Sequence, residues 1–511
     1  MAVNKVYKLN NLAPVLRDLK AKHKRIVQCH GVFDLLHPGH IRHFAAAKKR
    51  GDILVVTVTS DRYVNKGPDR PIFNEQLRAE AVASLTAVDF VAVNDAPTAV
   101  PAIYAVRPSF YIKGNEYGKK RAISSGGINK ETEAVKKVGG KIEFTDDITF
   151  SSTKLINNFL TPYPEATQEF LQGFQKRFSL EDILGYFEKI KNYKVLIIGE
   201  AIIDEYHYVR AMNKTPKDII IAARYEHEEA FAGGSIACAN HLTSYCKQVD
   251  LLTCLGAKDS KEKFIRAHLK SNVRPQFFYH PTAPTIVKRR FIDSPLLTKM
   301  FEVYYFVDSL IPEALEKKIL SHLKKVLPMY DLVIVADYGH GLLTPRLIDY
   351  LSHNAPFLAL NTQTNSANFG FNMATKYPRA DFVCIDHLEA RLITKKKEVA
   401  SLDEWKEILA AVTNKLKAKR IIVTLGHEGC LSYDGKKLYK VPVLSTRVLD
   451  RVGAGDAFLA ITSPLVRAGL PVEAAGFIGN AVGALAVTIV GNKHSVESNT
   501  LLKSINTLLK N

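Results

Sequence analysis

The sequence lacks the features of disulfide-linked, secreted and membrane-spanning proteins. Its 511 residues include six cysteines, which are scattered, with no C-x-x-C pair and no cysteine–histidine spacing typical of zinc. No stretch reaches the roughly 18 consecutive apolar residues that a membrane-spanning helix needs, and residues 1–10 lack the apolar core of a signal peptide. We therefore expect reduced thiols, no membrane partner and a cytoplasmic location.

Acidic residues are also in short supply. The chain has 51 Asp and Glu against 70 Lys and Arg, a formal net charge of +19. A basic surface can bind nucleic acid through its phosphates, but here the basic residues are spread along the chain without an interleaved stacking pattern of aromatic residues. Pockets for nucleoside triphosphates and sugar phosphates also need cationic groups. We therefore expect small phosphorylated ligands and no nucleic acid.

The length and the 47% hydrophobic composition are typical of a globular chain with two or three domains. From residue 25 to 93, short apolar runs alternate with helix-like stretches, which predicts a parallel sheet with crossover helices. Pro162 and Pro164 interrupt the pattern, and a second α/β series starts at Lys194. We predict an α/β fold in three parts: a Rossmann-like domain at 1–161, a linker at 162–190 and a second α/β domain at 191–511.

A glycine- and histidine-rich turn follows the first predicted strand. It reads HGVFDLLHPGH over residues 30–40 and leads into a predicted helix. The start of a helix carries unpaired N–H groups and partial positive charge, which suits a triphosphate. His37 and His40 are three residues apart and can reach one phosphate, and Gly39 lets the backbone approach closely. Taken alone, the pair is equally compatible with ordinary surface histidines.

The pattern G-x-F-D-x-x-H-x-G-H resembles a nucleotidyltransferase family that includes cytidylyltransferases and heptose-phosphate adenylyltransferases. Further family pieces follow in order, over roughly residues 25–160: Ser60-Asp61, Lys66-Gly67, Arg70-Pro71, Glu75 with Arg78, residues 113–117 and residues 151–154. His30 departs from the family pattern, which more often has a small hydroxyl or Asn there, and its role stays open. The H-x-G-H motif also occurs in class I aminoacyl-tRNA synthetases, but this domain is short for one and nothing resembles an anticodon-binding module.

The resemblance implies in-line attack of a phosphate oxygen on the α-phosphorus of a nucleoside triphosphate, with release of pyrophosphate. It makes His37, His40 and Lys66 catalytic, with Mg²⁺ as cofactor. The base is not specified, so ATP and CTP both remain. The implied nucleotide-binding residues are Gly31, Phe33, Asp34, Gly39, Lys113, Gly114, Ser151, Ser152 and Thr153.

The strongest segment of the second half reads DRVGAGDAF over residues 450–458, before a predicted helix. Glycines there let consecutive N–H groups converge on an anion, and a carboxylate just inside the helix can take a proton from a sugar hydroxyl. The segment resembles the D-x-x-G-A-G-D signature of ribokinase-like (phosphofructokinase-B) carbohydrate kinases. The resemblance implies an ATP- and Mg²⁺-dependent α/β kinase domain with a small β lid, and a homodimer through that domain.

The same resemblance assigns roles to residues of the second domain. It places Asp456 as the catalytic base and Gly453, Ala454 and Gly455 at the anion hole. Implied substrate contacts are Asp204, Gly233, Gly234, Asn240, Lys288, Arg290 and Asp337. Implied nucleotide contacts are Thr424, Gly426, Gly429 and Asn480. Glu389 acts on Mg²⁺ indirectly, and Asp386 is a candidate ligand.

Three departures from the heptose-phosphate kinase branch bear on the sugar. Ala237 stands where that branch usually has Asn, a contact that Asn240 can replace. Asp386 replaces the amide of the family's N-x-x-E motif, and residues 361–372 (NTQTNSANFGFN) do not match the branch. The sugar is therefore less certain from the sequence than the kinase reaction.

Together the two halves resemble the bifunctional heptose-phosphate kinase/adenylyltransferase family, in which the kinase comes first; here the order is reversed. We predict phosphorylation of a sugar such as D-glycero-D-manno-heptose 7-phosphate and adenylyl transfer to a sugar 1-phosphate, giving ADP-heptose and pyrophosphate. One alternative is a CTP-dependent N-terminal domain with a kinase for another sugar or polyol. A second is a basic nucleotide-sensing or nucleic-acid-binding protein with degenerate enzyme motifs.

Overall fold

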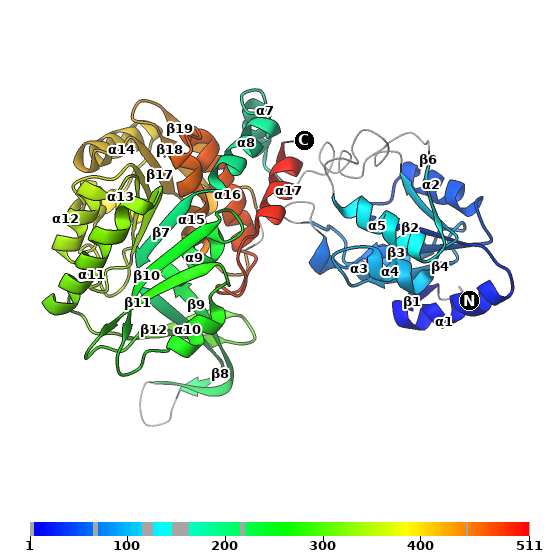
Figure 1. Ribbon diagram of the computed structural model, residues 1–511, viewed down its shortest axis with the longest axis horizontal. Helices are drawn as coiled ribbons and strands as arrows, with labels where there is room; N and C mark the ends of the chain where they lie inside the picture. Colours follow the sequence, from blue (N-terminus) through cyan, green and yellow to red (C-terminus); the bar gives the residue numbers. More distant parts are fainter. Residues whose placement is uncertain are drawn as a thin grey trace. The chain divides into compact units, whose positions relative to one another are not determined.

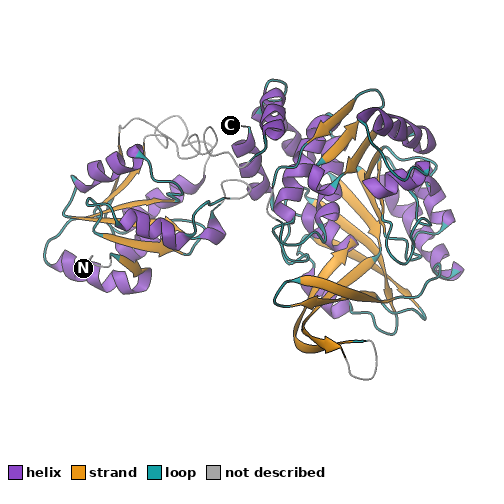
Figure 2. Cartoon of the chain, turned by 180° about the vertical axis from the view of Figure 1, so that it is seen from behind, coloured by secondary structure: helices purple, strands orange, loops and turns teal. Residues whose placement is uncertain are grey.

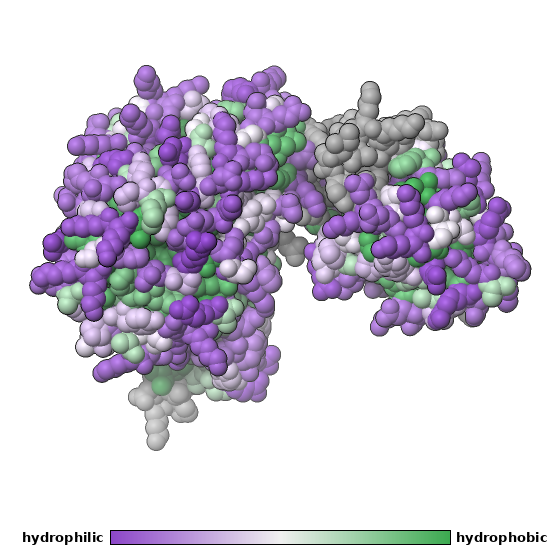
Figure 3. Space-filling view, viewed as in Figure 1, coloured by the Kyte–Doolittle hydropathy of each residue, from purple (hydrophilic) through white to green (hydrophobic). Residues whose placement is uncertain are grey.

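Two compact units make up the chain, and they divide between Pro162 and Tyr163. The computed structural model describes residues 5–64, 70–114, 126–145, 163–214, 220–445 and 448–509 (Figure 1). Among these residues, no helix is both long and apolar enough to cross a membrane. On the face seen in Figure 3, hydrophilic side chains cover most of the surface of each unit.

The N-terminal unit is built on a six-stranded parallel sheet in the order β1-β4-β3-β2-β5-β6. The strands are β1 (Val6–Lys8), β2 (Ile26–Gly31), β3 (Ile53–Thr59), β4 (Phe90–Asn94), β5 (Phe110–Gly114) and β6 (Lys141–Thr145). The helices are α1 (Leu9–Ala21), α2 (Pro38–Lys48), α3 (Glu75–Ala83), α4 (Val100–Val106) and α5 (Gly126–Lys137), with a short 3-10 turn at Asp61–Tyr63. Apolar residues of α2 and α3 pack on one face of the sheet, and those of α1, α4 and α5 pack on the other. Such two-sided burial explains why the strands read as continuous apolar runs.

The strand order of this sheet reverses between β2 and β5. The chain runs from β2 through β3 to β4 in one direction, and β5 then returns to pair with the other edge of β2. In parallel α/β sheets, ligands bind beyond the carboxyl ends of the strands at such a switch point. Here those ends are Gly31 of β2 and Gly114 of β5.

The second unit has a nine-stranded central sheet in the order β11-β10-β7-β14-β15-β16-β17-β18-β19. The strands are β7 (Lys194–Gly199), β10 (Gln248–Gly256), β11 (Val273–His280), β14 (Leu332–Asp337), β15 (Leu358–Thr362), β16 (Phe382–Asp386), β17 (Arg420–Thr424), β18 (Cys430–Tyr433) and β19 (Leu438–Val441). The first seven in spatial order are parallel, and β18 and β19 continue antiparallel. The confirmed fold class is therefore α/β in both units.

Helices cover both faces of this sheet (Figures 1 and 2). One face carries α7 (Glu165–Gln175), α8 (Leu180–Ile190), α9 (Ser235–Leu242), α15 (Ala454–Arg467), α16 (Val472–Ala486) and α17 (Ser498–Leu508). The other carries α11 (Glu313–Val326), α12 (Pro345–Asn354), α13 (His387–Thr394) and α14 (Leu402–Leu416). The remaining elements are α10 (Glu262–His268) and 3-10 turns at Leu327–Met329, Ala374–Lys376 and Gly426–Glu428.

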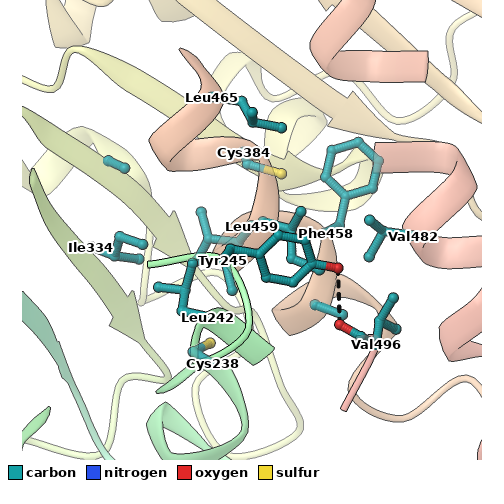
Figure 4. Close-up of a cluster of buried hydrophobic side chains, with 14 of the residues drawn as sticks. Cys238, Leu242, Tyr245, Ile334, Cys384, Phe458, Leu459, Leu465, Val482 and Val496 are labelled. Atoms are coloured by element: carbon teal, nitrogen blue, oxygen red, sulfur yellow. Dashed lines mark hydrogen bonds between the residues drawn. The ribbon is translucent and has the colours of Figure 1, made fainter. Parts of the chain in front are cut away.

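Helix α15 is the centre of the first of these layers. Every residue from Ala457 to Val466 is buried, as expected for a helix that is apolar on all sides. Figure 4 shows side chains of α15 meeting those of α9, α16 and the sheet, with the Tyr245 hydroxyl donating to the carbonyl of Val496 at 3.0 Å. The start of α15 is therefore held by a packed core.

A smaller four-stranded sheet forms the predicted lid, in the order β13-β12-β8-β9. Its strands are β8 (Ala201–Lys214), β9 (Ile221–Gly234), β12 (Ile286–Asp293) and β13 (Thr298–Tyr305). Strand β8 begins two residues after β7 ends, and β9 ends where α9 begins. The lid is thus continuous with the strand and helix that border the kinase site.

The expectation of a linker at 162–190 is wrong for most of that segment. Helices α7 and α8 place Leu171, Phe174, Ile183 and Phe187 in the core of the second unit. Ser179 and Asp182 form a capping box at the start of α8, which fixes the helix boundary. Pro162 and Pro164 interrupt the alternation of strands and helices in the N-terminal sequence. The apolar residues that follow them pack in the second unit.

Candidate active sites

The predicted histidine pair lies at the switch point of the N-terminal sheet. His37 is the N-cap of α2, and its Nδ1 accepts a hydrogen bond from the Gly39 N–H at 3.1 Å. The imidazole of His40, one turn into the helix, stacks on that of His37 with ring centroids 3.9 Å apart. The structure therefore brings the two histidines together at a helix N-terminus, where an anion is stabilised.

Gly31 and Phe33 act on this pair through packing. Phe33 has a left-handed backbone (φ 49°), and its ring meets that of His40 edge-on at 5.3 Å. A side chain at Gly31 would approach the Phe33 ring to 2.9 Å. These two motif residues thus leave room for, and support, the His40 imidazole.

Asp34 is engaged within the protein. Its buried carboxylate accepts from Arg70 Nε at 2.6 Å and from the Ile72 N–H at 2.8 Å. The guanidinium and carboxylate are 5% and 0% exposed, so this is a buried pair. The expected role in nucleotide binding is replaced, in this geometry, by anchoring the segment at residues 70–73 against the turn.

Arg78, one of the family motif residues in the sequence, has a structural role in this site that the motif alone did not predict. Its side chain is fully buried and donates to the carbonyls of Thr59 at 2.8 Å and Phe73 at 2.9 Å, and also to that of Val32. It donates further to the Asp61 carboxylate at 2.6 Å. One guanidinium thereby ties together the loops after β2 and β3 and the loop before α3, a use suited to its five fixed donors.

His30, whose role the sequence left open, is a partly buried residue that contacts two threonines of β3. Its Nδ1 lies 3.0 Å from the Thr57 hydroxyl, and its Nε2 lies 3.3 Å from that of Thr59. Burial, with a contribution from the Lys113 charge, lowers the pKa of His30 to about 3. The imidazole is therefore neutral at physiological pH.

The neighbouring strand end carries the next predicted contacts. Lys113, on β5, is ion-paired with Glu131 of α5 at 2.9 Å, and Gly114 ends the strand. Both lie across the switch point from the histidine turn. Lys66, Ser151, Ser152 and Thr153 lie outside the described residues, so their predicted roles stay predictions.

The predicted kinase base is partly buried at the start of α15. Gly453 caps this helix with a left-handed backbone (φ 80°), and Asp456 lies in its first turn. Burial raises the pKa of the Asp456 carboxyl to about 6; the Tyr338 hydroxyl, 2.7 Å away, and the Lys288 ammonium oppose that rise, and Asp204 adds to it. A carboxyl with this pKa is suited to proton transfer near neutral pH.

Lid residues meet beside this carboxylate. Arg290 of β12 is paired with Asp204 of β8, and Lys288, two residues before Arg290, is buried, which lowers its pKa. A side chain at Gly233 would collide with the Asp204 carboxylate. Gly234, which directly precedes α9, has φ 59°. The structure brings these five predicted substrate residues together under the lid.

The predicted anion-hole loop is tightly packed at Gly453 and has open space beside Gly455. A side chain at Gly453 would collide with the Asn492 amide, whereas a side chain at Gly455 would meet no atom within 4 Å. Ala454 packs against the core. Gly455 therefore has open space beside it in the first turn of α15.

Asp450, the first residue of the motif, fixes this loop to the lid. Its carboxylate accepts from the Tyr206 hydroxyl at 2.6 Å, the Lys299 ammonium at 2.8 Å and the Gly491 N–H at 2.9 Å. Tyr206 and Lys299 belong to lid strands β8 and β13. Asp450 was not predicted as a site residue, although it is the first aspartate of the D-x-x-G-A-G-D motif. That position was the signal in the sequence that could have identified it.

Among the predicted nucleotide contacts, Gly426 has open space beside it, whereas Gly429 and Asn480 contact the backbone of Val441. Gly426 (φ 61°) follows Thr424 at the end of β17, and a side chain there would meet no atom within 4 Å. At Gly429, a side chain would collide with the carbonyl of Val441. The Asn480 amide donates to the carbonyl of Val441 at 3.0 Å. Gly429 and Asn480 therefore shape the wall of this site through Val441.

Asp337 is likewise committed to internal partners. Its side chain is about 1% exposed and accepts from the Tyr377 hydroxyl at 2.7 Å and the Lys376 ammonium at 2.6 Å. Burial, and next the charge of Asp337, raise the pKa of neighbouring Glu200 to about 7. Asp337 lines a cavity of about 400 Å³ with Asp308 and other residues. The carboxylate is thus paired within the protein beside this cavity, and the predicted direct sugar contact stays a prediction.

Asp386 and Glu389 form a capping box at the start of α13, and their predicted roles toward Mg²⁺ stay predictions. The Asp386 carboxylate accepts from the Leu388 N–H at 2.7 Å, and Glu389 accepts from the N–H groups of Asp386 at 2.7 Å and Thr364 at 2.8 Å. Asp and Asn are equally good N-caps, which explains the departure from the family pattern. Burial raises the pKa of Glu389 to about 7. The described residues contain no cluster of three metal-ligating side chains.

Asn240 does not take the place of the side chain missing at Ala237. Its amide nitrogen donates to the carbonyl of His268 at 2.8 Å, and its oxygen accepts from the Lys270 N–H at 3.0 Å. Both ends of the amide are used to fasten the C-terminal end of α10 to α9. The expectation of a replacement sugar contact is therefore corrected to a structural role.

The two folds and the two side-chain clusters define the class: a carbohydrate-kinase unit joined to a nucleotidyltransferase unit. The chain belongs to the pfkB family carbohydrate kinases, whose family model matches residues 192–499. Residues 29–158 match the cytidylyltransferase-like family.

Individual proteins agree with both matches. The bifunctional protein HldE of Geotalea uraniireducens is 35% identical over 158 residues, and that of Methylobacillus flagellatus is 37% identical over 155 residues. Each match spans 30% of this chain and 30% of that relative's length. Escherichia coli phosphofructokinase-2 in complex with fructose-6-phosphate is 14% identical, with a TM-score of 0.50 over 62% of this chain and 99% of that chain. The last comparison shows the fold of the second unit.

Proposed function

We propose that the chain is a bifunctional transferase that phosphorylates a sugar in one unit and transfers a nucleotidyl group to a sugar phosphate in the other. The observation that carries the kinase half is the Asp456 carboxylate, which lies at the helix start beside Tyr338 and the lid residues and has a pKa raised by burial. The stacked histidines at the start of α2, with the HldE relatives, support the other half.

In the proposed kinase step, ionised Asp456 accepts the proton of a sugar hydroxyl as its oxygen attacks the γ-phosphorus of ATP. ADP leaves, and the N–H groups after Gly453 stabilise the charge on the transferred phosphoryl group. Lys288 and Arg290 orient the sugar under the lid. Mg²⁺ enters with ATP as part of the substrate, held by phosphate oxygens and water, which agrees with the internal pairing of Asp386 and Glu389.

In the proposed nucleotidyl step, a sugar-phosphate oxygen attacks the α-phosphorus of a nucleoside triphosphate and pyrophosphate leaves. His37 and His40 donate hydrogen bonds to the phosphate oxygens on which charge grows. The start of α2 adds the field of the helix dipole. Lys66, Ser151, Ser152 and Thr153 complete this site in the proposal.

For the substrates, we propose D-glycero-D-manno-heptose 7-phosphate or a related sugar for the kinase, and ATP for nucleotidyl transfer to a sugar 1-phosphate, giving ADP-heptose. The support is the shared N-terminal region with HldE relatives. A second candidate keeps both steps but uses CTP and another sugar or polyol, as the cytidylyltransferase-like match favours.

The test is to assay ADP and pyrophosphate separately, with the full chain, Mg²⁺, the sugar phosphate, and ATP or CTP in parallel reactions. Pyrophosphate with ATP and a sugar 1-phosphate supports adenylyl transfer, and pyrophosphate only with CTP supports the second candidate. A folded protein that forms neither product across a panel of sugars contradicts the proposed function.

We also propose a homodimer through the kinase unit, in the cytoplasm. Alternate residues of β13 expose apolar side chains on one face of the lid: Phe301 is 55%, Val303 38% and Tyr305 42% exposed. Sedimentation velocity tests the assembly, and Phe301→Glu is expected to yield monomers. A wild-type chain that is monomeric at micromolar concentration contradicts it.

A further inference from the structure

We propose that Tyr338 is a positioning residue of the kinase site, which holds the Asp456 carboxylate and favours its ionised form. This inference rests on the proposed role of Asp456 as the base. Tyr338 directly follows the last residue of β14, and Asp456 lies in the first turn of α15. The bond between them therefore joins the sheet to the anion-hole helix.

The geometry of Tyr338 allows it to act only as a donor to Asp456. Its hydroxyl lies 2.7 Å from Asp456 Oδ1, and the residue is 2% exposed. The other neighbour of this hydroxyl is Cys238 Sγ at 4.0 Å. Burial, and next the charge of Asp456, raise the pKa of Tyr338 well above its usual value. The phenol thus keeps its proton, and a donor stabilises a carboxylate more than a carboxylic acid.

The charged groups that act on Asp456 come from the lid strands. Strand β8 contributes Asp204, which raises the pKa of Asp456, and β12 contributes Lys288, which lowers it. Arg290 of β12 is paired with Asp204. Helix α9 contributes Cys238, whose thiol is neutral because burial raises its pKa well above its usual value. Removing the Tyr338 hydroxyl therefore changes the pKa of Asp456 without removing a formal charge from the site.

Tyr338 is itself fixed by the segment 361–372, which departs from the heptose-kinase pattern. The side-chain amides of Asn365 and Asn368 both donate to the carbonyl of Tyr338 at 2.8 Å. At Gly339 (φ 71°), a side chain would collide with the Asn368 amide. This segment therefore holds the backbone of Tyr338, while the hydroxyl of the same residue contacts Asp456, and its asparagines acquire a physical role.

A third amide extends the same support by one residue. Asn372, 4% exposed, donates from Nδ2 to the carbonyl of Asp337 at 2.9 Å. Its Oδ1 accepts from the Lys376 ammonium at 2.6 Å. Three asparagines thus fix two consecutive peptide carbonyls at the end of β14. Such over-determined backbone is how a site keeps one rotamer in place.

The experiment compares Tyr338→Phe with Tyr377→Phe in the full chain. Tyr377 is a matched control, because it is a fully buried tyrosine whose hydroxyl donates to a carboxylate, that of Asp337, at the same 2.7 Å. ADP release is measured from mildly acidic to mildly alkaline pH, giving kcat and KM for the sugar. Thermal unfolding of each variant is recorded in parallel.

For Tyr338→Phe, we expect the acid limb of the kcat profile to move to higher pH by about one unit, because a hydrogen bond to the ionised base is lost. The KM for the sugar stays near the wild-type value, and the profile of Tyr377→Phe keeps the wild-type position. An unshifted acid limb in a folded Tyr338→Phe variant, or an equal shift in both variants, overturns the inference.

Two further variants separate the possible failures. If Asp456→Asn retains kinase turnover, the proposed base is wrong; if it is inactive while Tyr338→Phe is unshifted, only the present inference fails. If Tyr338→Phe does not fold, site-specific fluorotyrosine at position 338 keeps the shape and makes the phenol a stronger donor. The acid limb then moves to lower pH, and a shift to higher pH contradicts the proposal.

Discussion

The two candidate sites of this chain are built in opposite ways. In the kinase unit, the reacting group is a single partly buried carboxylate, whose pKa is raised by burial, at the start of a helix that is enclosed by the core. In the N-terminal unit, two imidazoles stack at the start of a helix that covers one face of a smaller sheet. The difference teaches that proton transfer needs a pKa shifted by burial, whereas charge stabilisation needs donors held at the right place.

The largest expected effect tests the base of the kinase unit. Asp456→Asn keeps the size of the side chain but removes the proton acceptor, so kinase kcat should fall by about 10²–10⁴-fold. Pyrophosphate release from a supplied sugar 1-phosphate should remain at the wild-type rate. Asp386→Asn is the control, because an N-cap tolerates either residue, and its ADP release should stay within about twofold of wild type.

The reverse variant tests the histidine pair. His40→Ala removes one donor to the developing phosphate charge, so pyrophosphate release should fall by about 10²–10³-fold while ADP release is retained. His43→Ala is the control, since His43 lies on the same helix but bonds the Thr145 hydroxyl at 2.9 Å. If His43→Ala loses as much activity as His40→Ala, the pair is not the site.

A third variant asks whether the two units lose stability separately. Arg78→Met leaves three backbone carbonyls and Asp61 without their buried donor, which should cost about 3 kcal/mol of unfolding free energy. Pyrophosphate release should be lost at a temperature at which ADP release persists. Simultaneous loss of both activities on heating would show that the units unfold together.

The smallest expected effect is the pH dependence of stability. The folded-state pKa values of Asp456, Glu200 and Glu389 are raised, to about 6, 7 and 7, from usual values of 3.8, 4.5 and 4.5. The folded protein therefore binds more protons than the unfolded chain between about pH 4 and pH 7, so the kinase unit should lose stability as pH rises through this window. Denaturant unfolding at several pH values measures it; stability that rises through the window contradicts the assignment.

The sequence predicted the parts of the fold whose signals are local. The alternation of strands and helices, the turn before α2 and the glycine-capped start of α15 all lie within short segments, and the structure has them where expected. The structure gives Asp386 and Asn240 partners that the sequence did not predict, for the same physical reason. Each side chain was assigned to a ligand by family position, but each is satisfied by backbone groups nearby in space.

Contacts between distant segments were beyond the sequence. The partners of Asn240 are 28 and 30 residues away, and Tyr338 and Asp456 are separated by 118 residues. The proline-rich start of the segment at 162–190 hid two amphipathic helices whose apolar faces match a core formed by later residues. Pairing of this kind depends on the completed fold rather than on local pattern.

The most direct test of the central claim, that one chain carries two separate active units, is to produce residues 163–511 alone. The account predicts a soluble fragment that phosphorylates the sugar with a kcat within about twofold of the full chain and releases no pyrophosphate. A folded fragment that has lost the kinase activity, or one that still forms pyrophosphate from a sugar 1-phosphate, would contradict it.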